Sequence, residues 1–166
     1  MALDVQVARD DEEPIPKVDS ETHDVIIVGA GAAGIGVGIA IAHAGIENFL
    51  IVDRDTIGSS FSSWPEETRF ITPSFPSNSI GMLDLNSIAI GISPAFSMKV
   101  EHPTGKEYAK HLQDIAEYFE LPILENTNVD SIEKIDDLFH LNIRGGNLLA
   151  KNVIWAAGEY QYPLLD

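Results

Sequence analysis

The stretch Asp24-Val-Ile-Ile-Val-Gly29-Ala-Gly31-Ala-Ala-Gly34 decides the fold. Its apolar, β-branched residues predict a strand buried on both faces, and the glycines after it predict a tight turn into a helix. Each glycine has a separate task. Gly29 makes the turn, Gly31 lets a pyrophosphate approach the backbone, and Gly34 lets the helix pack closely on the strand. The pattern indicates a dinucleotide-binding turn, with the pyrophosphate on N–H groups at the positive end of the helix.

The residues on either side of the turn support this interpretation. A helix is expected over residues 32–44, ended by Gly45, and a second strand over residues 48–53. Asp53 lies 19 residues after Gly34, where a ribose-binding carboxylate belongs. The alternative is a glycine-rich turn in an unrelated α/β protein, with Asp53 as a solvated strand end. The order and spacing of the expected strand, turn, helix and second strand, with Asp53 at its end, disfavour that alternative.

Composition narrows the classes of protein and partner. The 166 residues are enough for one domain with a sizeable core, and the formal net charge of −16 argues against nucleic acid and anionic membranes as partners. No apolar run approaches the roughly 20 residues of a membrane span, and the acidic N-terminus lacks the features of a secretory signal, so a cytoplasmic protein is expected. There is no cysteine, which excludes thiolate metal sites and thiol redox chemistry within these residues.

The histidines and serines give no catalytic or metal-binding pattern. The five histidines show no metal-ligand spacing, so no metal site is expected, and His111 is predicted to lie on the surface of a helix. Four serines cluster between residues 59 and 63, but no histidine–carboxylate partner is near them in the sequence. No catalytic residue is therefore assigned.

Outside the turn, the chain divides into recognisable segments. Residues 1–22 are interpreted as an acidic, mobile leader, and residues 23–166 as one domain. Residues 54–100, rich in proline, serine and aromatics, are expected to form an irregular packed excursion that covers the cofactor. Thr104 and Glu107 predict a capping box that begins an amphipathic helix. The strands expected after that helix are, in order, 121–125, 129–135, 138–144, a short 148–151 and a buried parallel strand 152–157, with a hairpin turn at 145–146.

This order predicts an α/β fold: a Rossmann-like domain with a βαβ start, a central parallel sheet and an antiparallel β-meander. A simple NAD-binding domain would continue with repeated βα units, so the meander disfavours an NAD-dependent dehydrogenase fragment.

Over residues 24–163 the sequence resembles the FAD-binding N-terminal part of the flavin-containing and Baeyer–Villiger monooxygenase-like flavoproteins, and most of all their bacterial cation-transport-associated group. The resemblance rests on the glycine turn with Gly38, on Asp53-Arg54, on residues 58–64 and 64–77, and on Val153-Ile-Trp-Ala-Ala157-Gly158. The last segment looks like a second flavin motif, with Ala157 in place of the usual threonine. A related family of dithiol reductases would have two cysteines near residues 58–64, where this chain has serines.

The resemblance implies FAD as cofactor and a set of binding residues. These residues are Gly29, Gly31, Ala32, Ala33, Gly34, Asp53, Arg54, Ser60, Trp64, Val129, Ala157 and Gly158. Asp53 would hold the adenosine ribose, where the family more often has glutamate, through a water or a small backbone shift. Arg54 would flank the adenine, and the backbone of Val129 would meet the edge of that base. Ala157 and Gly158 would close over the cofactor, and Gly58 and Trp64 match a flavin-proximal motif only in part.

The implied function is the FAD-binding domain of an NAD(P)H-dependent flavoprotein oxidoreductase of monooxygenase type. The family's second, NADPH-binding domain is missing from these residues, so a truncated form is expected, and NADPH and a small-molecule substrate belong to the complete enzyme only. The alternative is a flavin- or nucleotide-binding module, or a partner subunit, without turnover of its own. Self-association is a further expectation, because a bare flavin cleft would expose apolar surface.

Overall fold

The computed structural model describes residues 21–72, 74, 84 and 86–158. Its centre is a six-stranded sheet in the order β3-β2-β1-β6-β5-β4. The strands are β1 (Thr22–Val28), β2 (Phe49–Val52), β3 (Ile123–Leu124), β4 (Val129–Ile135), β5 (Leu138–Ile143) and β6 (Gly146–Trp155). β3, β2, β1 and β6 run parallel, whereas β6, β5 and β4 form an antiparallel meander. The predicted α/β class, with a parallel sheet and a meander, is confirmed.

The long strand β6 joins the two parts of the sheet. Its first half, residues 146–150, pairs antiparallel with β5, and residues 149–155 pair parallel with β1. The sequence predicted two strands here, one ending at Lys151 and one beginning at Asn152, and that division is wrong. Both polar side chains are held along the strand: the Lys151 ammonium lies 2.7 Å from an Asp24 carboxylate oxygen, and the Asn152 amide donates to the Asp24 carbonyl.

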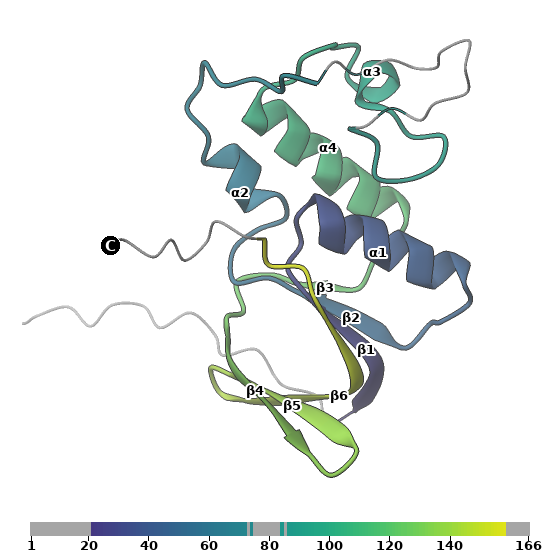
Figure 1. Ribbon diagram of the computed structural model, residues 1–166, viewed down its shortest axis with the longest axis vertical. Coiled ribbons are helices and arrows are strands. Elements are labelled where there is room, and N and C mark those ends of the chain that lie inside the picture. Colours follow the sequence, from purple (N-terminus) through teal and green to yellow (C-terminus); the bar gives the residue numbers. More distant parts are fainter. Residues whose placement is uncertain (1–20, 73, 75–83, 85, 159–166) are drawn as a thin grey trace, which may run out of the picture.

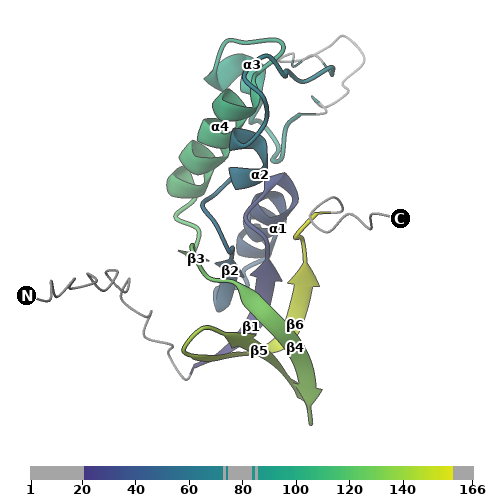
Figure 2. The ribbon, with the colours of Figure 1, turned by 90° about the vertical axis from the view of Figure 1, so that its left-hand side faces the viewer.

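The helices cover one face of the sheet and the meander packs over the other (Figures 1 and 2). α1 (Ala32–His43) and α4 (Gly105–Tyr118) contribute to a core with Val25 and Ile27 of β1. The alternate β1 residues Ile26 and Val28 face a second core, formed with meander side chains. This alternation is expected for a strand buried on both faces. No helix among the described residues has the length and apolar character needed to cross a membrane.

The excursion between β2 and α4 holds two short helices, α2 (Ser59–Ser62) and α3 (Pro94–Ser97). The remainder of its described part is irregular, as predicted, and residues 73, 75–83 and 85 lie outside the described residues. α4 begins at the predicted capping box: Thr104 Oγ1 accepts from the Glu107 amide, and Glu107 accepts from the Thr104 amide at 2.8 Å. The predicted leader lies almost entirely outside the described residues, and β1 begins at Thr22.

Gly34 allows a test of how closely α1 packs on the preceding turn. A Cβ at Gly34 would lie 1.8 Å from the Gly29 carbonyl oxygen, so Gly34→Ala forces backbone to move. The expected loss in unfolding free energy is about 1–3 kcal/mol, which outweighs the gain of up to ~1 kcal/mol from better helix propensity. Urea unfolding followed by circular dichroism measures it.

Gly31→Ser is the matched control, because a Cβ at Gly31 meets no atom of the described residues within 4 Å and serine is a favoured N-cap residue. Its stability should equal that of the wild type or exceed it slightly. Equal stability of the Gly34→Ala variant would contradict the packing described here.

Candidate cofactor site

The glycine turn lies between the ends of β2 and β6. Gly29 adopts a φ of +114°, in the region that favours glycine, and its amide donates to the Val52 carbonyl at 2.8 Å. A Cβ on Gly29 would lie 2.4 Å from the carbonyl oxygen of Ala156. The turn therefore requires glycine here because the backbone following β6 passes directly against it.

The start of α1 is open at the middle glycine of the motif. Gly31 is the N-cap residue, with an ordinary extended conformation (φ −82°, ψ −170°), and no side chain caps the first turn. Since a Cβ at Gly31 would meet nothing within 4 Å, the described residues leave the space in front of it open. Ala32 and Ala33 follow as the first helical residues, and Ala33 is exposed. Uncapped N–H groups at a helix start are suited to an anion.

Asp53 links the end of β2 to the glycine turn. Its carboxylate accepts from the Ala30 amide at 2.6 Å and from the Asp55 amide at 2.9 Å. The predicted site acid is therefore beside the turn, as the spacing in the sequence required. Both carboxylate oxygens already accept a backbone donor, so a ribose hydroxyl would have to use their remaining lone pairs.

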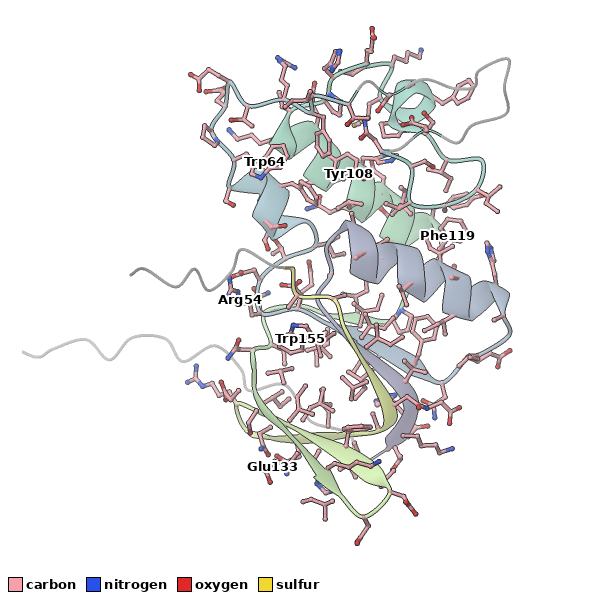
Figure 3. The ribbon with its side chains drawn as sticks, viewed as in Figure 1. Arg54, Trp64, Tyr108, Phe119, Glu133 and Trp155 are labelled. Carbon is pink, nitrogen blue, oxygen red and sulfur yellow. The ribbon has the colours of Figure 1, made fainter. Side chains whose placement is uncertain are left out.

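Two further predicted residues, Arg54 and Val129, lie near this end of the sheet. Arg54 is exposed and its Nε lies 3.2 Å from an Asp55 carboxylate oxygen; Figure 3 shows it at the carboxyl edge of the sheet. The segment before Val129 is tied to β2, because the Thr127 amide donates to the Asp53 carbonyl at 2.8 Å. Val129 itself is half-buried against the meander core, and the β4–β5 register shifts just after it.

The segment after β6 completes this group of residues. The Ala156 amide donates to the Val28 carbonyl at 2.8 Å, which extends the β1–β6 ladder to the turn. Ala157 follows, and Gly158 has a φ of +84°. The structure thus brings together the two glycine-containing motifs that lie more than a hundred residues apart in the sequence.

Ser60 and Trp64 have different surroundings. Trp64 packs in an aromatic cluster with Phe61 and Phe70, whose ring centroids lie 5.4 and 5.1 Å from its own. Ser60 is exposed on α2 and its carbonyl accepts the Ser63 hydroxyl. The connection from this segment to the glycine turn is made by Gly58, whose amide donates to the Ala30 carbonyl at 3.1 Å. The Ser62 and Ser63 hydroxyls donate to the backbone carbonyls of Ser59 and Ser60, which gives no support to serine catalysis.

The sequence did not predict a buried polar cluster under the excursion. Asp84 accepts from the Ser93 hydroxyl and the Asn86 amide, and the Tyr108 hydroxyl donates to the Asn86 carbonyl at 2.8 Å. Burial raises the pKa of Tyr108 to about 12, with a further contribution from the Asp84 carboxylate. These bonds join the excursion to α4 and have a structural role.

His111 belongs to the same region, and the prediction that it lies on the helix surface is wrong. Only 2% of it is exposed, its Nδ1 lies 2.8 Å from the Ser97 hydroxyl, and its Nε2 has no hydrogen-bond partner among the described residues. Its spacing from Tyr108 and Ile115, three and four residues away, places it on the buried face of α4. This helical spacing is the feature of the sequence that indicates burial of His111.

Comparison with known proteins identifies the family to which the chain belongs. The family model described as pyridine nucleotide-disulphide oxidoreductase matches residues 26–166, most of the chain. The chain belongs to this family. Because none of the 166 residues is cysteine, this member has no thiol of its own here for disulfide exchange.

Individual relatives cover different parts of the chain. An uncharacterized CzcO-like oxidoreductase from Geobacillus kaustophilus is 42% identical over 64 residues, which are 39% of this chain and 18% of that protein. Bacillithiol disulfide reductase from Staphylococcus aureus superimposes with a TM-score of 0.70 at 17% identity, over 83% of this chain and 39% of that chain. A flavin-containing monooxygenase from Stenotrophomonas maltophilia gives 0.62 at 20% identity, over 83% and 39%.

The chain therefore spans well under half of the length of these relatives. The comparisons confirm the oxidoreductase family and the Rossmann-like fold expected from the sequence. Neighbours with this fold include a flavin-containing monooxygenase and a protein solved with FAD and NADP, which agrees with the predicted cofactor. The roles of the individual site residues stay predictions.

The surroundings of His111 give a pH dependence that can be measured. Burial lowers the pKa of His111 from its ordinary value near 6.5, and the carboxylates of Asp114 and Asp84 oppose this only in part. The unfolded chain therefore binds this proton more readily than the folded one. This contribution to the unfolding free energy is fully present above about pH 6.5 and falls as the pH is lowered through that value toward the folded pKa.

Urea unfolding of the wild type and of a His111→Gln variant at about pH 7.5 and pH 5.5 isolates this effect, because all other groups titrate in both proteins. The wild type should lose more stability than the variant on acidification. An equal loss in the two proteins would contradict the assignment to His111.

Proposed function

We propose that this chain binds FAD as the flavin-binding part of an NAD(P)H-dependent flavoprotein oxidoreductase of monooxygenase type. The observation that carries the proposal is the contrast among the three glycines of the turn. Gly29 and Gly34 are glycine because backbone atoms press against them, whereas no described residue lies within 4 Å of a Cβ at Gly31. Internal packing does not explain glycine at Gly31, but close approach of a pyrophosphate does.

The other groups at the site fit the rest of an FAD molecule. Asp53, whose carboxylate accepts the Ala30 amide, would bind the adenosine ribose beside the turn. Arg54 and the backbone of Val129 lie near the carboxyl end of β2, beside Asp53. They would contact the adenine. Ala157 and Gly158 follow the strand that contacts Gly29, so they would close over the pyrophosphate. Residues from β1 onward form the proposed FAD-binding domain.

When bound, the flavin supplies the electron-transfer chemistry. The residues of this chain bind it, orient it and exclude water from it. Ser60 and Trp64 would act on the flavin side of the site, since Gly58 connects their segment to the turn. Trp64 would do so through the rigid aromatic cluster in which it packs.

The alternative function is a flavin-binding module without turnover of its own. One observation favours it: the described site residues offer backbone donors and a carboxylate that already accepts two amides, and no nucleophile paired with a base. Flavin chemistry does not require such a pair, so this observation alone does not decide between the two functions.

FAD binding is tested by titrating the purified chain with FAD and following flavin absorbance, with equilibrium dialysis as an independent measurement. We expect saturable binding by the wild type and its loss, by about a hundredfold or more in affinity, in a Gly31→Val variant whose side chain fills the pyrophosphate space. The φ and ψ of Gly31 are accessible to valine, so the fold should survive, as circular dichroism would show.

Ala40→Val, which adds a β-branched side chain at an exposed position of the same helix, is the matched control and should bind FAD like the wild type. A wild-type chain that does not take up FAD would refute the proposal. Unchanged binding by Gly31→Val would place the pyrophosphate elsewhere.

A second experiment tests whether these residues by themselves support reduction of the flavin. The FAD-loaded chain is mixed with NADPH without oxygen, and the visible flavin band is followed. The sequence has one Gly-x-Gly-x-x-Gly turn, at residues 29–34, and the proposed FAD site uses it, so reduction no faster than that of free FAD is expected. Faster bleaching would rule out the module without turnover and assign flavin reduction to these residues.

A further inference from the structure

Trp155 is the last residue of β6 and has an exposed indole. Trp155 is 59% exposed, although its strand partner Val28 is buried and the two residues before it, Val153 and Ile154, are half-buried. Single exposed apolar residues are common in proteins, so exposure alone carries no argument. The position of Trp155 does, because it lies at the carboxyl edge of the sheet where the cofactor site is formed (Figure 3).

Strand register places Trp155 in a row with two site-bearing strands. Val28 pairs with Val52 on one side and with Trp155 on the other. Neighbouring strands lie about 4.8 Å apart, so the Trp155 backbone is roughly 10 Å from that of Val52. The next residue after Val52 is Asp53 and the next after Val28 is Gly29. Trp155 therefore lies in the row of paired residues that comes one position before the proposed ribose-binding and pyrophosphate-binding residues.

Alternation along β6 defines the face of the sheet that Trp155 occupies. Ile154 packs in the core on the helix side, and Val153 packs with Val28 and Val52 in the core on the meander side. Trp155 shares the parity of Val153, so its side chain projects on the meander side. There it adds an exposed aromatic surface to an otherwise apolar and buried row.

Backbone hydrogen bonds restrict where a base attached to a ribose at Asp53 can lie. On the β3 side, the Thr127 amide donates to the Asp53 carbonyl at 2.8 Å and the Asn126 amide donates to the Asp55 carbonyl at 3.0 Å. On the helix side, the Gly58 amide donates to the Ala30 carbonyl. The adenine is thus expected over the ends of β1 and β2. Val129, whose backbone would contact the adenine, packs with Val28 and Val52 in the core on the meander side, the side on which Trp155 projects.

We propose that the indole of Trp155 stacks on the adenine ring of the bound dinucleotide and is an adenine-binding residue of this chain. The inference rests on the proposed FAD binding and deepens it, because it assigns the base a platform made by β6. Stacking between a base and an aromatic side chain changes affinity by about tenfold or more when the ring is removed. It tolerates another aromatic ring, because the contact is with a π-face.

The affinities of three variants for FAD and ADP test the proposal. Trp155→Ala should bind both ligands about tenfold more weakly or worse, and Trp155→Phe should retain most of the affinity. Tyr118→Ala removes another exposed aromatic side chain, 78% exposed near the end of α4, and should bind like the wild type. Wild-type affinity of Trp155→Ala for both ligands would refute stacking while leaving FAD binding intact. Failure of the wild type to bind either ligand would refute the proposed function as well.

Fluorescence provides a readout that does not depend on a loss of affinity. The chain has two tryptophans, so Trp64→Phe leaves Trp155 as the single indole emitter. ADP does not absorb tryptophan emission, so quenching by ADP in this variant reports contact with adenine. Pyrophosphate, which lacks the base, should bind without quenching. If calorimetry shows that ADP binds while the emission is unchanged, Trp155 is not the adenine platform.

Discussion

Three backbone segments meet at one point, and the fold depends on that contact. The turn after β1 lies against the carbonyl of Ala156 on one side and against the start of α1 on the other, and no Cβ fits at Gly29 or Gly34. Because these are backbone atoms, no rotamer change can relieve a clash there. The position of α1 over the sheet and the position of β6 beside β1 are therefore set by the same two missing side chains. β6 in turn carries the meander, so the contact fixes both layers of the domain.

Much of this arrangement could be predicted because it is encoded in short-range patterns. The apolar run before Gly29, the capping box of Thr104 and the spacing from Gly34 to Asp53 each act within a few tens of residues. The continuity of β6 could not be predicted in this way. Lys151 and Asn152 interrupt its apolar pattern, and only the distant Asp24, which bonds to both side chains, makes that polar pair compatible with one strand. Tertiary partners decide such positions, and the sequence around them does not reveal the partners.

The candidate site shows the same division. The motif spacing predicted the proximity of Asp53 to the glycine turn, but not that its carboxylate would accept the Ala30 amide. The polarity of His111 favours a surface position, but its helical spacing from Tyr108 puts it on the buried face of α4. The bonds of Asp84 with Ser93 and Asn86 arise from an irregular segment without periodicity, which leaves no pattern to interpret. Sequence patterns thus predicted which residues form the candidate site, whereas the polar cluster beneath the excursion emerged only from the structure.

The pairing of β1 with β6 has a consequence for how the domain assembles. Asp24 and Lys151 are 127 positions apart, and β1 remains without its neighbour on that side until β6 arrives. In long-range parallel pairing of this kind, the entropy loss of closing the loop precedes the stabilisation by contacts, so the pairing slows folding. On the ribosome, the glycine turn emerges early but cannot be closed by Ala156 until nearly all of these residues have been synthesised. The candidate cofactor site is therefore among the last parts of the domain to form, and nascent chains expose the apolar edge of β1 in the interval.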